Sequence, residues 1–208
     1  GTHVSAIGRT TVVGEDDVWI HEPGTPQRLR IGERTAPLVV GEEIRDWLIH
    51  TPRPTIYPCR TLGGTAVPET DPVVRHLWPY RTPLRSRSVF GKRIEENGRH
   101  WWEHLEHYTE KLRTPFAIAF PFVATHNHFV LDRGGKLFNR TGPAIKLEAS
   151  ATLEQHLVLV GILNSSVACF WMKQVFYPKS SAVGDVSAEA GKPEESRYEL
   201  TGTGLMEF

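Results

Sequence analysis

One stretch constrains the fold more than any other: residues 114 to 147 form the densest run of strand-forming sequence in the chain. Polar residues break this run only where turns are needed. Its first segment is apolar but contains Pro115 and Pro121, and proline cannot donate a hydrogen bond to a neighbouring strand. We therefore expect an edge or kinked strand there, and not a central one.

Two shorter strands are expected after this segment, at His128–Asp132 and Lys136–Asn139. The sequence Arg-Gly-Gly at residues 133–135 separates them, and glycine readily adopts the positive φ of a tight hairpin. A further turn precedes an expected strand at Ala144–Leu147. The stretch therefore predicts a meander of three or four strands with cations at or near its turns, which are Arg133, Lys136 and Arg140.

The next segment changes to helical periodicity, and Thr152 with Gln155 forms a capping-box pattern. Asn164–Ser166 interrupts this pattern, because Asn suits the end of one helix and Ser suits the N-cap of the next. We expect Leu153–Val175 to form two helices that meet at Asn164–Ser166. Four of their side chains are expected to be buried: Leu157, Leu163, Phe170 and Trp171.

The rest of the chain gives shorter signals. Strands are expected at Thr10–Val13, Val18–Ile20 and Leu38–Val40, a short helix at Glu42–Ile49, a mobile loop near residues 178–196, and a strand or turn at Tyr198–Phe208. Val73–Asn97 predicts a helical arm, regular only after Thr82 because of Pro79 and Pro83. Together the signals predict an α+β fold: a short-stranded mixed or antiparallel sheet with packed helices.

Length and composition limit the class of protein. The 208 residues suffice for one domain with a substantial core, so we expect a single domain over residues 1–208. Cys59 and Cys169 have no partner motif, which favours a reducing cytoplasm. No apolar run approaches the roughly 20 residues that span a bilayer, so no membrane partner is expected. The chain begins with Gly1 and has no signal peptide, which suggests a piece of a longer protein.

The charge is zero overall but unevenly distributed along the chain. Residues 72–146 contain thirteen Lys and Arg against six Asp and Glu, and the remainder contains eleven against eighteen. A basic segment of this kind is the electrostatic signature of a duplex-binding surface, since phosphate neutralisation supplies much of the affinity for DNA. The neutral net charge nevertheless argues against a high affinity of this chain for DNA when it stands alone.

Catalytic and metal motifs are missing from the sequence. His126, Asn127 and His128 are adjacent, whereas the nuclease motif that shares their letters spreads over a ββα unit. A zinc site built from His126, His128, His156 and Cys169 lacks the paired spacing of structural zinc ligands. There is no Gly-rich phosphate loop, nucleophile elbow, dinucleotide fingerprint or Asn-Pro-Pro-aromatic string. We therefore expect no catalytic residue, no metal and no cofactor in this chain.

Several strings carry a resemblance that spans nearly all 208 residues in the same order. They are IGRTTVVGEDD, APLVVGEEIRDW, ATHNHFVLDRGGKLFNR, LVGILNSSVACFWMKQ and RYELTGTGLMEF. With these strings the chain resembles the C-terminal part of PglX, the adenine-specific DNA methyltransferase family of bacterial BREX and phage growth limitation systems. The Leu-Asn-Ser-Ser string is shared more widely with Taq-type and Eco57I-like adenine methyltransferases.

The resemblance implies a target recognition domain. In such enzymes an N-terminal domain binds S-adenosylmethionine and carries the catalytic motif, while the C-terminal part grips double-stranded DNA and reads the site. It implies that this chain does not transfer methyl groups alone, and that its partners are duplex DNA, its own N-terminal methyltransferase domain and other defence-system proteins.

The residues predict how such a domain would contact DNA. Phosphate contacts are expected from Arg81, Arg85, Arg87, Lys92 and Arg93, on a polar face of the arm. Base contacts are expected from the segment 125–140, whose side chains can bond base edges. The candidates in that segment are Thr125, His126, Asn127, His128, Arg133, Lys136, Asn139 and Arg140.

An alternative function is a protein-interaction module that docks the methyltransferase to other defence components through Trp78, Trp101 and Trp102. Trp101 and Trp102 belong to an aromatic stripe at helical spacing, and such stripes usually pack into a core. The other interpretation of this stripe is a stacking surface for bases. An even spread of the basic residues over all faces would remove the main support for DNA binding.

Overall fold

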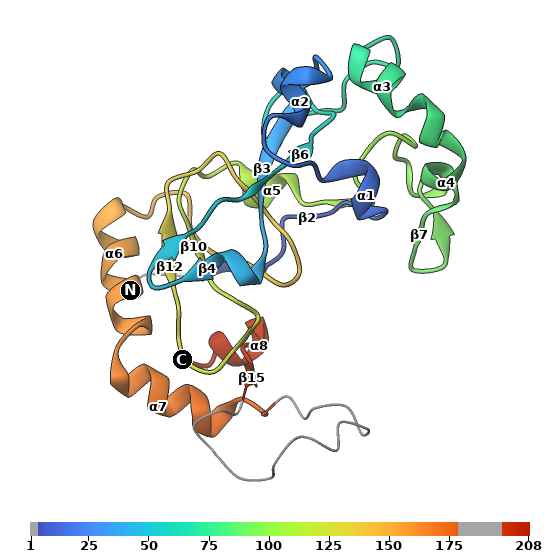
Figure 1. The fold of residues 1–208 in the computed structure, drawn as a ribbon. Coiled ribbons are helices and arrows are strands. Elements are labelled where there is room, and N and C mark those ends of the chain that lie inside the picture. Colours follow the sequence, from blue (N-terminus) through green and yellow to red (C-terminus); the bar gives the residue numbers. More distant parts are fainter. Residues whose placement is uncertain (1–3, 179–196) are drawn as a thin grey trace, which may run out of the picture.

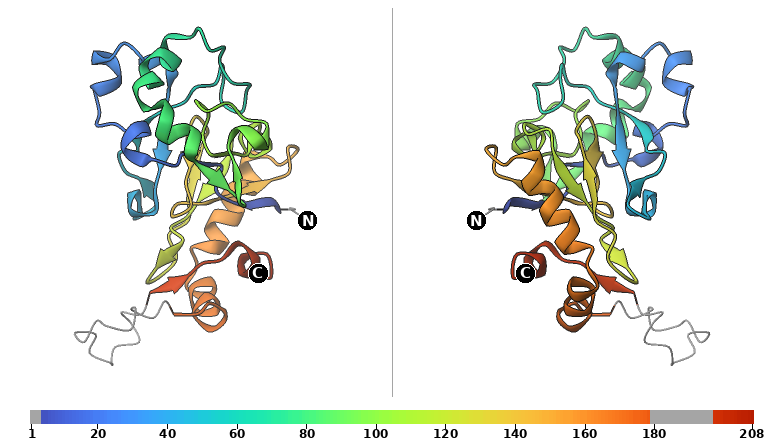
Figure 2. Two further views of the ribbon diagram at one scale, coloured as in Figure 1. Left: turned by 90° about the vertical axis from the view of Figure 1, so that its right-hand side faces the viewer. Right: turned by 90° about the vertical axis from the view of Figure 1, so that its left-hand side faces the viewer.

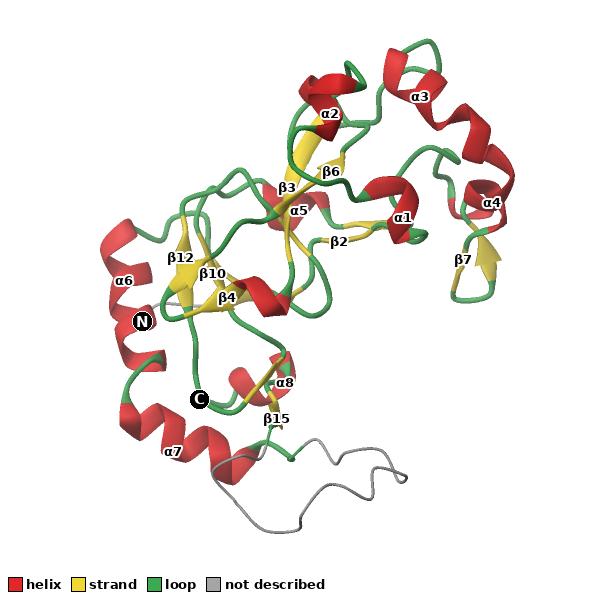
Figure 3. Cartoon of the chain, in the orientation of Figure 1, coloured by secondary structure: helices red, strands yellow, loops and turns green. Residues whose placement is uncertain are grey.

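The computed structural model describes residues 4–178 and 197–208 and has the predicted α+β fold (Figure 1). The mobile loop expected near residues 178–196 lies outside the described residues from position 179 onward. Short strands occupy the middle of the molecule, with two consecutive helices at one end and the helical arm at the other (Figure 3).

The strands are β1 (Val4–Gly8), β2 (Thr11–Val12), β3 (Thr35–Val39), β4 (Ile44–Arg45), β5 (Leu48–Ile49), β6 (Arg53–Ile56), β7 (Ser88–Val89), β8 (Lys92–Arg93), β9 (Glu106–His107), β10 (Ala117–Ala119), β11 (Val123–Ala124), β12 (Val130–Asp132), β13 (Leu137–Phe138), β14 (Ala144–Leu147) and β15 (Tyr198–Glu199). The α-helices are α1 (Asp16–Trp19), α2 (Thr25–Arg28), α3 (Pro72–Leu77), α4 (Arg81–Ser86), α5 (Thr109–Leu112), α6 (Leu153–Leu163), α7 (Ser166–Val175) and α8 (Gly202–Leu205). Single 3-10 turns are η1 (Gly32–Arg34), η2 (Gly41–Glu43), η3 (Trp78–Tyr80) and η4 (Glu95–Asn97).

The largest sheet has the order β1-β14-β10-β12, and all of its pairs are antiparallel. Ile145 of β14 faces Ile7 of β1 on one side and Ile118 of β10 on the other. β10 is therefore a central strand, and the prediction of an edge strand is wrong. Pro115 and Pro121 both lie outside Ala117–Ala119, so neither removes a hydrogen bond from the ladder.

The two predicted helices pack on this sheet as α6 and α7, which confirms their boundaries (Figure 2). Thr152 and Gln155 form the predicted capping box, and Ser165 accepts the N-cap hydrogen bond from Ala168. Leu163 is buried and Trp171 is half-buried against the sheet core. The predicted burial of Leu157 and Phe170 is wrong, because 49% and 69% of these side chains are exposed on the outer face.

The predicted hairpin between residues 128 and 139 is also wrong. β12 pairs with β10, whereas β13 leaves that sheet and pairs in parallel with β3, with Leu137 facing Leu38. β3 pairs in turn with β6, which gives a second sheet in the order β13-β3-β6. Leu137 and Phe138, which point to opposite faces of this sheet, are both buried there. Pairing with β3 therefore removes both side chains from water, which an exposed hairpin with β12 would not do.

A hairpin replaces the short helix expected at Glu42–Ile49. After η2 the chain forms β4 and β5, and Ile44 pairs with Ile49. The reversal uses Asp46 and Trp47, whose φ angles of 50° and 62° are the left-handed values of a type I′ turn. Within Glu42–Ile49 the spacing of the apolar residues fits both a helix and a strand. The pairing of Ile44 with Ile49 across the two strands therefore decides that the segment forms a hairpin.

The arm is helical before residue 87 and forms a hairpin after it, in contrast to the prediction. Asp71 caps α3 by accepting a hydrogen bond from the backbone N–H of Val73. Pro72, Pro79 and Pro83 each occupy the first turn of a helix, where a missing N–H costs nothing. Strands β7 and β8 then pair with each other.

Trp101 and Trp102 are buried, which confirms that this aromatic stripe belongs to the core. Trp102 donates its ring N–H to the backbone oxygen of Val67 at 3.2 Å. Trp78 is 50% exposed. The docking surface proposed from these three residues is therefore reduced to Trp78 alone.

Within residues 4–178 and 197–208, no single helix has both the length and the apolar composition needed to cross a membrane; α6 and α7 would reach them only as a pair, which is bent by 66°.

Candidate nucleic-acid interface

An open cleft of about 840 Å³ lies where four chain segments meet: the start of the β4–β5 hairpin, the chain from β11 to His128, the turn at residues 139–142, and β15. Its charged and ionisable lining residues are Glu42, Arg45, His128, Arg140, Arg197 and Glu199. Three arginines against two glutamates leave a positive excess. Phe122 and Thr125 add an aromatic face and a hydroxyl group to the lining.

Two glycines allow the walls of the cleft to meet. A Cβ atom on Gly41 would lie 2.2 Å from the backbone oxygen of Thr141, and one on Gly142 would lie 2.8 Å from the carbonyl carbon of Val40. Because neither glycine has a side chain, the Gly41 N–H can donate to the Thr141 hydroxyl at 3.0 Å. The two loops are therefore fixed against each other at this point.

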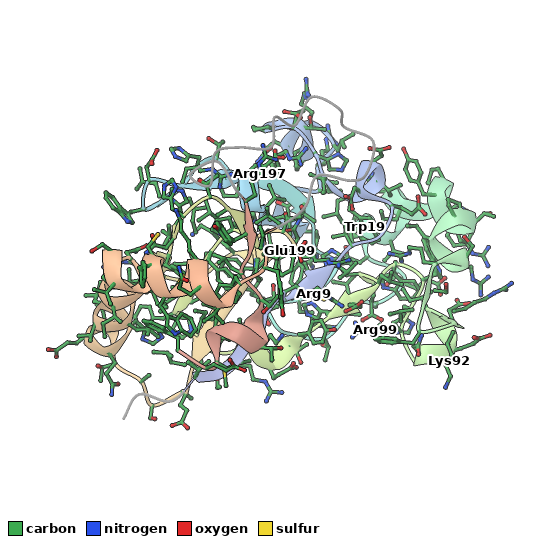
Figure 4. All side chains as sticks on the ribbon, turned by 90° about the horizontal axis from the view of Figure 1, so that it is seen from below. Arg9, Trp19, Lys92, Arg99, Arg197 and Glu199 are labelled. Atoms are coloured by element: carbon green, nitrogen blue, oxygen red, sulfur yellow. The ribbon has the colours of Figure 1, made fainter. Side chains whose placement is uncertain are left out.

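The arginines of the cleft differ in how firmly they are held. Arg45 donates through Nη1 to the backbone oxygens of Gly41 at 2.8 Å and Ile44 at 2.6 Å. Arg140 and Arg197 are exposed, and neither side chain bonds another group in the described part of the chain. Figure 4 labels Arg197, which lies just before β15, and Glu199, which lies in this strand. A guanidinium group presents a planar fork of donors, which suits phosphates and the O6/N7 edge of guanine.

His128 is the buried ionisable group of the cleft. Burial lowers the pKa of its imidazole, and repulsion from His126 and Arg45 lowers this pKa further, partly opposed by Asp46. The His126 and His128 rings lie 4.1 Å apart between centroids. His128 therefore stays neutral at pH 7, with one ring nitrogen able to donate and the other able to accept.

The hairpin β4–β5 carries an exposed aromatic residue next to the cleft. Trp47 is 67% exposed at the tip of this hairpin, two residues from the cleft arginine Arg45. An exposed indole beside cations can stack on a base, a contact worth about 1–3 kcal/mol per base. The prediction from sequence did not include Trp47.

Asn127 has a structural role that differs from the predicted base contact. Its amide donates to the backbone oxygens of Leu163 at 2.7 Å and Ser165 at 3.1 Å, so both donors are used at the corner between α6 and α7. Asn164 completes the corner by exchanging two hydrogen bonds with the backbone of Phe129. We therefore remove Asn127 from the base-contact residues, because its amide holds the helix pair to the strand.

Asn139 is likewise a turn residue. Its side-chain oxygen accepts from the backbone N–H groups of Thr141 and Gly142 and from the Thr141 hydroxyl. This pattern shapes the turn that presents Arg140 to the cleft. Thr125, for its part, shares a hydrogen bond of 2.9 Å with the exposed ring of His126.

Arg133 and Lys136 lie at the other end of β12, away from the cleft. They border a separate hollow of about 160 Å³ together with Leu112 and Thr114. Lys136 is paired with the buried carboxylate of Asp132, which also accepts from the Gly134 N–H. The structure thus divides the predicted reading segment between two places, with Thr125, His128 and Arg140 in the cleft.

The five arm residues that were predicted to contact phosphates differ in what surrounds their side chains. Lys92 and Arg93 are exposed on β8. Arg85 forms an exposed ion pair with Glu95 at 2.9 Å, and the Arg81 guanidinium lies 4.8 Å from the centroid of the Trp78 ring.

Arg87 does not lie on a polar face, so that part of the prediction is wrong. Its side chain is buried and donates to the backbone oxygens of Leu84, Val13, Trp101 and Glu103 at 2.6–2.9 Å. Its guanidinium also lies over the Trp19 ring. These bonds occupy the donors that a phosphate would need, so Arg87 anchors the arm to the core.

Arg45 and Arg197 are the main residues that sequence reasoning missed. They reach the cleft from segments about 80 residues before and about 70 residues after its central segment, through pairings such as Val123 with Glu199. No local motif marks either residue. Their positive charge was the only available signal, and both arginines stand among acidic residues, Arg45 between Glu43 and Asp46 and Arg197 before Glu199.

No protein-family model matches the chain. The chain is 42% identical over 207 residues, 97% of its length, to the adenine-specific methyltransferase PglX of Streptomyces coelicolor, and it spans only 17% of that relative. The chain is therefore similar, along nearly its whole length, to one part of PglX.

Proposed function

We propose that this chain is the DNA target recognition domain of an adenine-N6-specific DNA methyltransferase in a bacterial anti-phage system of the BREX type. It positions the duplex for S-adenosylmethionine-dependent methylation by a separate N-terminal domain. In this proposal residues 1–208 act as one cytoplasmic domain that holds no cofactor of its own. Its DNA contacts come from the cleft and from the exposed cations of the arm.

The observation that carries the proposal is the cleft, where Arg45, Arg140 and Arg197 from three distant segments converge beside neutral His128. Exposed guanidinium forks, a neutral imidazole and a nearby indole are the groups that bond and stack on nucleic-acid bases. The 42% identity to PglX supports the methyltransferase part of the proposal, since that relative is named an adenine-specific methyltransferase.

The test measures binding of the full-length methyltransferase to its methylated motif and to a scrambled duplex over a range of salt concentrations. Methylome sequencing of the host with and without the enzyme identifies the motif. Arg140→Ala should reduce the discrimination between the two duplexes by about 1–3 kcal/mol, because a bidentate base contact is lost. Arg28→Ala is the matched control, since the Arg28 side chain is exposed on α2 and, among the residues that the structure describes, bonds only the Thr25 hydroxyl. Equal behaviour of the two variants would contradict the proposal for the cleft.

A second candidate function is docking of other protein segments, favoured by the outer face of α6 and α7. Val158, Val167 and Phe170 are 56%, 75% and 69% exposed there. Apolar residues exposed together mark interaction surfaces more often than isolated ones do. Phe170→Asp should weaken association with the separately expressed remainder of the methyltransferase at least tenfold in a titration. An unchanged dissociation constant would dismiss this face as a docking surface.

A further inference from the structure

The hairpin β7–β8 has an unusual residue at its tip. Its two-residue turn consists of Phe90 and Gly91, with φ angles of 51° and 77°, the left-handed values of a type I′ turn. Asn or Asp normally occupies the first of these positions, because a bulky side chain is strained there. Phe90 is also 92% exposed, so its ring packs against almost nothing in the part of the chain that the structure describes. Neither backbone conformation nor packing explains a phenylalanine at this place.

The strands of the hairpin surround this ring with positive charge. Lys92 pairs with Val89 and Arg93 pairs with Ser88, and both cations are exposed. Within residues 4–178 and 197–208, neither side chain forms an ion pair. Figure 4 shows Lys92 extending outward at the end of the molecule opposite α6 and α7.

The base of the hairpin is firmly anchored. Asn97 donates to the backbone oxygens of Lys92 and Arg93, and the Ile94 N–H donates to the backbone oxygen of Arg87 at 3.0 Å. The Ile94 side chain is completely buried, and the buried Arg87 guanidinium connects the same point to the core. The hairpin therefore projects its aromatic tip from a rigid support.

We propose that Phe90 inserts between adjacent base pairs of the bound duplex while Lys92 and Arg93 contact the flanking phosphates. Stacked bases between two phosphate chains present apolar faces bordered by negative charge, which complements an apolar ring bordered by cations. Apolar wedges of this kind partly unstack a base step and kink the duplex by about 20–90°. This inference rests on the proposed function, namely that the chain binds duplex DNA.

The test uses the full-length methyltransferase and a duplex that carries the methylated motif and a fluorophore at each end. Energy transfer between the fluorophores reports the bend, and anisotropy reports the affinity. Phe90→Asn removes the ring but keeps a residue suited to the turn, so the hairpin stays intact. We expect Phe90→Asn to abolish the bend and weaken binding about tenfold without changing its salt dependence. Phe90→Trp should retain both properties, and the new indole should be quenched by DNA.

Two further variants separate the ring from the charges. Lys92→Ala should retain the bend but flatten the plot of log K against log salt by about 0.9, the contribution of one phosphate contact. Tyr177→Ala, which removes an aromatic side chain that is 86% exposed just after α7, should match the wild type in bend and affinity.

Each remaining outcome has a defined meaning. If the wild type binds DNA and Phe90→Asn bends and binds it equally well, the wedge is refuted and the proposed function stands. If Phe90→Asn binds and bends DNA normally in the full-length enzyme, but the separately expressed segment with Phe90→Asn no longer associates with the remainder of the methyltransferase, Phe90 contacts protein and the wedge is again refuted. If the wild type binds no duplex at any salt concentration, the proposed function fails and the wedge fails with it.

Discussion

Arg87→Ala should destabilise the fold and leave phosphate binding unchanged, the opposite of what a surface arginine would do. The Arg87 guanidinium forms four hydrogen bonds of 2.6–2.9 Å to backbone oxygens, so truncation removes four charge-assisted bonds at once. Each such bond contributes about 1.5–3 kcal/mol before the cost of desolvating the charge.

The net loss is smaller than the sum of these bonds. Burial of the guanidinium costs free energy, as shown by its pKa, which burial lowers to about 10. The Val13 oxygen also keeps a hydrogen bond of 3.4 Å from the Leu105 N–H. We therefore expect the free energy of unfolding to fall by about 3–5 kcal/mol, as when one partner of a buried charged contact is removed.

Urea denaturation at pH 7 measures this loss. Arg85→Ala is the matched control, because the Arg85–Glu95 ion pair is exposed and contributes about 0–1 kcal/mol. At temperatures where Arg87→Ala remains folded, its salt dependence of DNA binding should equal that of the wild type. A loss below about 1 kcal/mol combined with a salt slope flattened by about one unit would show that Arg87 contacts phosphate after all.

Three other predictions follow from buried positions. Leu163→Ala should lower the free energy of unfolding by about 2–5 kcal/mol in urea denaturation, whereas Phe170→Ala should lower it by less than about 0.5 kcal/mol. Similar losses for the two variants would contradict the burial of Leu163 and the exposure of Phe170. Gly41→Ala should lower the free energy of unfolding by about 1–3 kcal/mol and reduce DNA discrimination, because its Cβ would clash with a carbonyl oxygen. Gly161→Ala is the control: open space surrounds this position, so the substitution should stabilise the fold by about 0.5–1 kcal/mol. Equal effects of the two substitutions would refute the close approach at Gly41. Burial lowers the pKa of His104 to about 3, so between pH 6 and pH 4 only the unfolded state binds a proton at this residue. The free energy of unfolding should therefore fall by about 1.4 kcal/mol per pH unit in this range. His104→Gln should remove that part of the pH dependence, and an unchanged pH dependence would exclude His104 as its source.

The sequence predicted those elements whose signals are local. The boundary between α6 and α7 could be found because Thr152, Gln155 and Ser165 cap helix ends within three or four residues of themselves. The direction in which the helices face could not be found. Apolar residues surround α6 on most sides, so only the contact with the sheet decides that Leu163 is buried and Leu157 is exposed.

Strand partners escaped prediction for the opposite reason. β13 follows β12 after a glycine turn, yet it pairs with β3, about 100 residues earlier in the chain. Local sequence specifies a strand but not its distant partner, because pairing depends on which surfaces are buried together.

The candidate interface shows the same limit. The segment 125–140 was expected to contact bases as one surface, and the structure places only Thr125, His128 and Arg140 of its candidates along the cleft. The roles of Asn127 and Arg87 were missed, because the carbonyl groups that bind them come from other parts of the chain. A polar side chain next to a strand or helix gives no sign of whether it bonds the protein or a ligand.

The pairing of β1 with β14 imposes an order on folding during synthesis. Val4 pairs with Leu147, so the first strand of this segment leaves the ribosome long before its partner. At about 5–20 residues per second, the intervening chain takes roughly 7–30 seconds to synthesise. During that time β1 presents an unpaired edge, which is prone to pair with other chains. A nascent chain that stalls before β14 would therefore depend on chaperones, and the large sheet can close only after most of the segment has been made.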